Sequence, residues 1–180
     1  MTGTVLALAR DDVHAFSKPL AARLDLLEGL GVAGDAHCGA TVQHRSRLAA
    51  NPPPPNLRQV HLLHSELLEW LADEGFSVSP GELGENITTF GVKLLDLPTG
   101  TRLSIGESVV LELTGLRNPC RQIEAFSPGL LARLARKMPN GRIERLAGVM
   151  AVVRSGGPIS IGDVITAHPP ATPHQPLRPV

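Results

Sequence analysis

The sequence predicts a mainly β protein whose strands roll into a barrel. Three observations support this fold class. Glycine and proline, with 18 and 16 residues, interrupt the chain often. Short runs of Val, Ile, Leu and Thr lie between these interruptions, as is typical of strands. At 180 residues with 42% hydrophobic content, the chain is long enough to bury one core and short for two.

The expected strands follow one another at the spacing of a barrel or a tightly rolled sheet. They are Thr4–Ala9, Arg23–Leu27, Gln59–Leu63, Asn86–Thr89, Arg102–Ile105, Val109–Thr114, Gly148–Arg154 and Val164–Ala167.

Two helices are expected to interrupt this pattern. Ser65 is the predicted N-cap of a helix over Glu66–Glu74, which has a leucine stripe on one face and Gly75 as its stop. A second helix is expected to start at Ser127 and Pro128 and to run through Lys137 with a similar stripe. Both stripes are interpreted as core contacts.

Two proline-rich stretches are expected to lie outside the strands. The four prolines at 52–55 favour an extended surface loop. The tail Pro169–Val180 is predicted to be disordered, so that residues 1–168 form the single folded domain.

Composition excludes several function classes. The 17 basic residues balance 17 acidic ones, and aromatic residues make up only 3% of the chain, so neither nucleic acid nor an acidic membrane is an expected partner. The first residues lack a secretory signal pattern, and no stretch is long enough to cross a membrane, so a cytoplasmic protein is expected. Phosphate-loop, dinucleotide and Gly-x-Ser-x-Gly motifs are absent from the sequence.

The strongest site signal is the segment from Gly115 to Gln122. It places Cys120 in a loop after an apolar strand, with Arg117 and Arg121 on either side. Nearby cations favour a thiolate, which is the form that attacks electrophilic sulfur and binds soft metals. Pro119 restricts itself and Asn118, which would hold the loop in one shape. The alternative is a small residue packed at a strand end beside solvated arginines.

A second cluster is Gly34–Gly39, in which Asp35, His37 and Cys38 are all capable ligands or proton carriers. A zinc site of His37, Cys38, His44 and Cys120 is one interpretation, but its spacing matches no compact zinc motif. A polar loop is the other.

A third cluster, Gly84-Glu85-Asn86, places an acid and an amide where a turn enters a strand. These residues either orient a ligand or satisfy backbone groups of the turn. Lys18, His14 and Arg58 are candidate anion contacts, with ordinary surface charge as the alternative.

Taken in order, Gly34-Asp35-Ala36-His37, Gly84-Glu85-Asn86 and Asn118-Pro119-Cys120 resemble the MOSC domain family, named for the C-terminal domain of molybdenum cofactor sulfurases. The resemblance spans roughly residues 3–168. It implies a closed β-barrel similar to that of pyruvate kinase with a few peripheral helices.

The resemblance also implies that the chain binds the molybdenum cofactor or carries sulfur on Cys120, which would be the catalytic residue and the metal ligand. The residues expected to hold the cofactor are Arg117, Asn118, Arg121, Asn86, Glu85, His37, Asp35 and Lys18. The chain has no room for the pyridoxal-phosphate domain of full sulfurases, so no pyridoxal phosphate site is expected.

Three function hypotheses remain open from the sequence. The first is a binding and sulfur-relay module supplied by a cysteine desulfurase. The second is a molybdenum-dependent reductase of N-hydroxylated compounds that uses a separate electron-donor protein. The third is a zinc-stabilised or purely structural barrel. The sequence does not indicate an oligomeric state.

Overall fold

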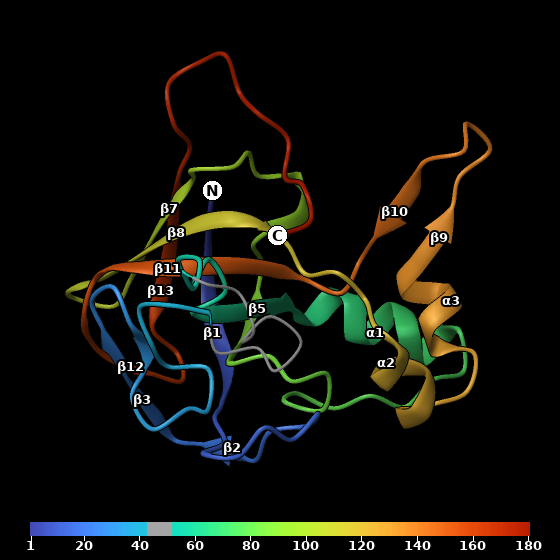
Figure 1. Cartoon of the computed structure of the whole chain (residues 1–180), viewed down its shortest axis with the longest axis horizontal. Helices are drawn as coiled ribbons and strands as arrows, with labels where there is room; N and C mark the ends of the chain where they lie inside the picture. Colours follow the sequence, from blue (N-terminus) through green and yellow to red (C-terminus); the bar gives the residue numbers. More distant parts are fainter. Residues whose placement is uncertain (43–51) are drawn as a thin grey trace.

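A computed structural model describes residues 1–42 and 52–180, and within these residues a closed barrel of seven strands forms the centre of the molecule (Figure 1). In their order around the barrel, the strands are β13 (Val164–His168), β7 (Arg102–Ile105), β8 (Val109–Leu116), β11 (Val149–Ser155), β5 (Val60–His64), β6 (Ile87–Phe90) and β1 (Thr2–Ala9). The pairing of β1 with β13 closes the ring. This architecture confirms the predicted mainly β fold and its closed barrel.

The barrel is antiparallel except where β5 and β6 run parallel. A parallel pair needs a crossover connection, and here the crossover contains helix α1 (Ser65–Asp73). Short β2 (Leu20–Ala21) extends the end of β1. A separate small sheet has the order β12 (Gly157–Ser160), β3 (Arg23–Leu27) and β4 (Gly31–Val32).

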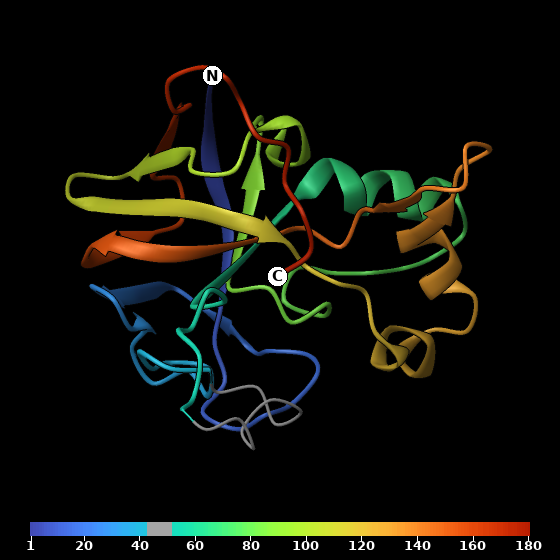
Figure 2. The same ribbon diagram turned by 45° about the horizontal axis from the view of Figure 1, so that its top comes forward.

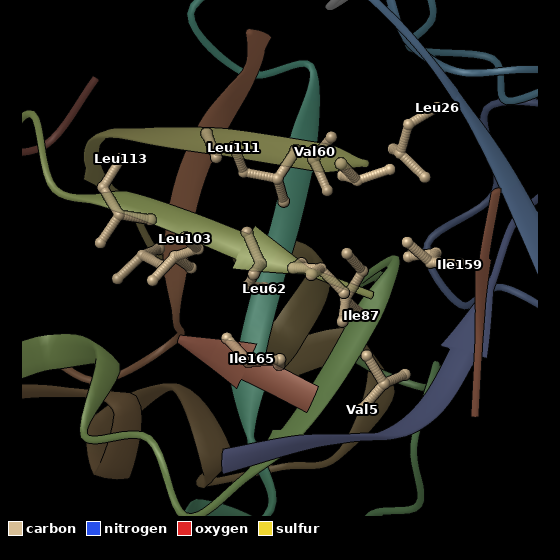
Figure 3. Close-up of a cluster of buried hydrophobic side chains, with 14 of the residues drawn as sticks. Val5, Leu26, Val60, Leu62, Ile87, Leu103, Leu111, Leu113, Ile159 and Ile165 are labelled. Carbon is tan, nitrogen blue, oxygen red and sulfur yellow. The ribbon is translucent and has the colours of Figure 1, made fainter. Parts of the chain in front are cut away.

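The barrel interior is filled by aliphatic side chains that meet from opposite strands (Figure 3). On β8, burial alternates strictly, because Val109, Leu111 and Leu113 point inward while their neighbours face outward. On β5 the pattern is continuous instead. Leu62 joins the barrel core and Leu63 joins a second cluster on the outside, because helices cover that face of the strand.

The second cluster lies between the barrel and α1, α2 (Arg121–Phe126) and α3 (Leu130–Leu134). These helices gather on one side of the barrel together with a projecting hairpin of β9 (Ala135–Lys137) and β10 (Ile143–Arg145) (Figure 2). A short 3-10 helix, η2 (Leu94–Asp96), precedes β7.

The first predicted helix is present, but its cap differs from the prediction. Ser65 is the first helical residue, and His64 occupies the N-cap position without a side-chain cap bond. Ser65 therefore lies one residue past the position from which a side chain caps a helix, and its hydroxyl lies 3.5 Å from Oε2 of Glu66.

The second predicted helix, from Ser127 to Lys137, is wrong at its C-terminal end. Only Leu130–Leu134 is helical, and Ala135–Lys137 forms β9 against β10. The pairing with a strand that comes later in the chain overrides the local helical pattern. Helix α2, which follows Cys120 directly, was not predicted.

The two proline-rich stretches behave differently. Pro52–Pro55 is exposed, and Pro55 forms only an isolated bridge with Thr41. The tail, in contrast, lies along the barrel: the N–H of Thr99 donates to the Gln175 carbonyl at 2.8 Å, and Leu177 packs against the core. These contacts differ from the expectation of a disordered tail.

Among the helices of the described ranges, none combines the length and the apolar character that crossing a membrane requires.

Candidate functional site

A cavity of about 300 Å³ opens where the end of β8 meets β5, the start of β6 and the loop before β2. Six of the residues predicted for the site line it: Lys18, His37, Asn86, Arg117, Asn118 and Cys120. The other lining residues are Ala15, Phe16, Val42, Asn56, Arg58, His61, Gly84, Gln122 and Met150. The three sequence clusters therefore meet at one place, although they are far apart in the chain.

Cys120 lies at the junction between the β8 loop and α2, where it occupies the N-cap position of that short helix. It is half-buried and not disulfide-bonded. Its thiol lies 3.5 Å from Oε1 of Gln122. The thiol is thus part of the cavity wall and not of the apolar core.

Arg117 is a buried cation in the cavity wall that is suited to bind an anionic ligand. Its guanidinium lies 5.8 Å from the centre of the Phe16 ring. The Nη1 atom is buried and has no hydrogen-bond partner among the described residues. Burial lowers the pKa of Arg117, while the nearby Cys120 and Glu85 oppose that shift. A buried donor without a partner is costly, so this atom is suited to an acceptor brought in by a ligand.

Asp35 does not line the cavity, but it forms hydrogen bonds with three residues that do. Its Oδ2 accepts from Lys18 Nζ at 2.5 Å and from Asn86 Nδ2 at 2.8 Å, and its Oδ1 accepts from the His37 backbone N–H at 2.9 Å. Burial raises the pKa of Asp35, but the hydrogen bonds of His37 and the Lys18 ammonium outweigh it and hold the pKa well below its usual range. Lys18 is therefore a buried, paired cation and not a surface charge.

Asn86 connects the barrel strands to this group. Its Nδ2 also donates to the Ala9 carbonyl at 3.2 Å, and its Oδ1 accepts from the His61 N–H at 3.2 Å. Both ends of the amide are occupied by the protein. Asn86 therefore shapes the cavity wall and has little capacity left to bind a ligand.

Glu85 is fully buried and does not line the cavity. Its Oε1 accepts from the Gly81 N–H at 2.7 Å and from the Thr88 hydroxyl at 3.1 Å, whereas Oε2 has no partner within the described chain. Burial raises the pKa of Glu85. The structure thus places Glu85 behind the cavity wall, where direct contact with a ligand is blocked.

Arg121 and Asn118 lie toward the outside. Arg121 is exposed at the start of α2 and is not part of the cavity wall. Asn118 lines the cavity rim, and its Oδ1 accepts a 3.0 Å bond from Nε of Arg145 in β10. Contrary to expectation, the structure therefore does not bring Arg121 and Glu85 into one pocket wall with the other residues.

The sequence did not single out His61, Asn56 or Gln122, and Arg58 was given only as a candidate anion contact. His61 is buried, with Nε2 at 2.8 Å from the Ala147 carbonyl. Burial and the neighbouring Arg117 lower its pKa well below the usual value, so the ring is neutral at physiological pH. The sequence feature that could have identified His61 is its position as a histidine within the apolar run Val60–His64.

A zinc cluster is not seen in the described part of the chain. Residues 1–42 and 52–180 contain no group of three or more His, Cys, Asp or Glu side chains placed to hold a metal ion. Cys38 does not line the cavity. His44, the remaining residue of the zinc hypothesis, lies outside the described residues.

Comparison with protein families gives a match to the MOSC domain over residues 37–166, which is more than half of the chain. The chain belongs to the MOSC domain family. This match confirms the family to which the three sequence clusters pointed. No curated protein matches the chain significantly.

Solved structures with the same MOSC-type fold include the YuaD protein of Bacillus subtilis. It is 23% identical, has a TM-score of 0.75, and the match covers 95% of this chain and 98% of that one. YiiM of Escherichia coli is 18% identical with a TM-score of 0.63, covering 97% of this chain and 73% of that one. At these identities, the likeness establishes the fold.

Proposed function

We propose that this MOSC protein binds the molybdenum cofactor in the Cys120 cavity and uses the Cys120 thiol to hold the metal or to carry sulfur. One observation carries the proposal: Cys120 lines the same cavity as Arg117, a residue whose buried Nη1 atom has no hydrogen-bond partner among the described residues. A soft ligand beside a buried cation is the combination that an anionic metal-dithiolene group requires.

The side chains present fit such a cofactor. Its phosphate would be held by the cations of the wall, Arg58, Arg117 and Lys18. Its flat pterin would lie against the apolar part of the wall, which includes Phe16 and Met150. When bound, the cofactor supplies a molybdenum centre that can exchange sulfur or electron pairs.

The chain's own contribution to sulfur carriage is the Cys120 thiolate. It attacks the terminal sulfur of a donor persulfide, and a new sulfur–sulfur bond forms as the donor's bond breaks. The donor cysteine leaves as a thiolate, and Cys120 becomes the persulfide. Such a donor would be a cysteine desulfurase, because that class of enzyme forms a persulfide on its own cysteine.

A second candidate is a molybdenum-dependent reductase of N-hydroxylated compounds that receives electrons from a separate donor protein. The observation in its favour is the mixed lining of the cavity, in which Phe16, Val42 and Met150 provide apolar contacts near Cys120. Such walls suit a small organic substrate. A reductase requires a reduced electron carrier for turnover, whereas sulfur carriage does not.

Elemental analysis tests cofactor binding most directly. The protein and its Cys120→Ala and Cys38→Ala variants are purified from a host that makes the cofactor, and molybdenum and zinc are measured per chain. We expect molybdenum in the parent and in Cys38→Ala, and a loss of at least tenfold in Cys120→Ala, which corresponds to about 1.4 kcal/mol or more. Equal molybdenum in both cysteine variants contradicts the role of Cys120 as a metal ligand, and zinc alone in all three proteins contradicts cofactor binding.

A further inference from the structure

The β9–β10 hairpin presents two faces that differ in what they contact. Opposite residues in an antiparallel pair share a face, so Arg136 and Glu144 lie on one side, and Lys137, Ile143, Ala135 and Arg145 lie on the other. The first face points to α1, because the Arg136 guanidinium lies 5.4 Å from the Trp70 ring centre. The second face is named here the docking face.

Charge is concentrated on this hairpin. The segment 133–145 has five basic side chains and one acidic side chain, a net charge of +4, although the whole chain is neutral. Arg133 and Arg136 pair with Glu74 and Glu144. Lys137, Arg142 and Arg145 form no ion pair with any residue that the structure describes.

Apolar groups accompany these cations. Ile143 is 51% exposed and Met138 is 38% exposed. Beside Ile143 is a hollow of about 460 Å³, whose wall includes Pro119, Leu131 and Ala135. Methionine and arginine side chains are enriched at protein interfaces, and the hairpin exposes both. Surfaces that bind single-stranded nucleic acid use aromatic stacking instead, and the chain has no tyrosine and one tryptophan.

The hollow lies next to the Cys120 cavity. Asn118 lines both, and its side chain is tied to the hairpin by Arg145. Pro119, in the wall of the hollow, is bonded directly to Cys120. A protein seated in the hollow would therefore meet the loop that holds the thiol.

We propose that the docking face and the adjacent hollow bind an acidic surface of the protein that donates persulfide sulfur to Cys120. This inference rests on the proposed function, which requires a donor. Charge complementarity selects the partner: Lys137, Arg142 and Arg145 attract a carboxylate-rich surface, while Ile143 fills an apolar contact at its centre.

Site-specific photo-crosslinking in the host cell tests the proposal. A benzophenone amino acid replaces Ile143 in one variant and Ile161 in another. Ile161 is a matched control, because it is 56% exposed and lies in the turn between β12 and β13, across the barrel from the hairpin (Figure 1). The cross-linked peptides are identified by mass spectrometry. We expect position 143, and not position 161, to capture one protein through a segment rich in Asp and Glu.

Charge-reversal variants provide a second test of the docking proposal. Lys137→Glu with Arg142→Glu should lower the yield of the cross-link at position 143 by at least fivefold. The matched pair Arg23→Glu with Lys93→Glu makes the same change in net charge elsewhere and should leave the yield unchanged. The molybdenum content of each variant is measured separately, so a failure of cofactor binding is distinguished from a failure of docking.

Three outcomes overturn the docking proposal. They are the absence of any cross-link at 143, equal capture at 143 and 161, and yields that do not respond to charge reversal. Binding of a single-stranded DNA oligonucleotide that depends on Lys137 and Arg142, measured by fluorescence anisotropy, would assign the face to nucleic acid instead.

Discussion

Asn86 Nδ2 donates a 2.8 Å hydrogen bond to Oδ2 of Asp35, two residues 51 positions apart in the chain. The same carboxylate oxygen accepts from Lys18. Because Asp35 and Lys18 are both buried, this three-residue group joins separate loops at the base of the cavity and determines its shape.

Replacing Asp35 with asparagine should strongly destabilise the protein. The variant leaves the Lys18 ammonium buried without its counter-charge, which costs about 3–5 kcal/mol in comparable pairs. Urea unfolding at neutral pH measures the loss. The double variant Lys18→Met with Asp35→Asn should be more stable than Asp35→Asn alone, and the reverse order would contradict the account.

Acid should remove the contribution of Asp35. Its folded-state pKa is held below the ordinary value of 3.8, so the stabilisation is fully present above that value. It is lost as pH falls through the lower folded-state pKa, because the unfolded chain takes up the proton first. The unfolding free energy of Asp35→Asn, measured as a function of pH, should lack this acid-dependent component.

His61 and His64 should make the protein less stable in mild acid. Burial is the largest cause of the lowered pKa of both rings, and Arg117 adds to it at His61. Since each folded-state pKa is lower than the unfolded value of 6.5, stability is present above that pH and declines below it. Thermal unfolding from about pH 7 to about pH 5 should show a weaker decline in His61→Gln than in the parent.

Cys120 should react with iodoacetamide faster than Cys38 near neutral pH. Burial and then Asp35 raise the pKa of the Cys38 thiol, whereas Cys120 lies in the cavity with Arg117. Mass mapping of the labelled peptides gives both rates. Arg117→Gln should slow labelling of Cys120, and Arg121→Gln should not, because Arg121 lies outside the cavity. Faster labelling of Cys38 would refute the electrostatic argument.

The C-terminal tail should contribute to stability through Gly115. A side chain at this position would collide with the Arg178 carbonyl and with Val180. Gly115→Ala should therefore displace the tail from β8 at a cost of about 1–3 kcal/mol. Limited proteolysis should then cut near residues 175–180 faster than in the parent. In a chain shortened to end at His174, the same substitution should have little effect, because the atoms that the new methyl group would meet are gone.

The local sequence pattern was sufficient to predict a strand where the burial of its residues follows the periodicity of the sequence. The alternating residues of β8 and the short apolar run of β5 identified barrel strands, because a closed sheet imposes those patterns on its own residues. The pattern failed at Ala135–Lys137, whose strand conformation depends on β10. It also missed α2, whose six residues are too few to show helical periodicity.

The sequence by itself determined that this is a β-barrel of the MOSC type, and it singled out Cys120 as a candidate reactive residue, because strand patterns and a loop cysteine between arginines are local features. Only the tertiary structure decided which residues share the cavity. It brought Lys18, His37 and Asn86 to Cys120, added His61, and placed Arg121 and Glu85 outside the wall. The direction and burial of a side chain depend on contacts between distant segments, as the Asp35–Asn86 bond illustrates, and no local pattern records them.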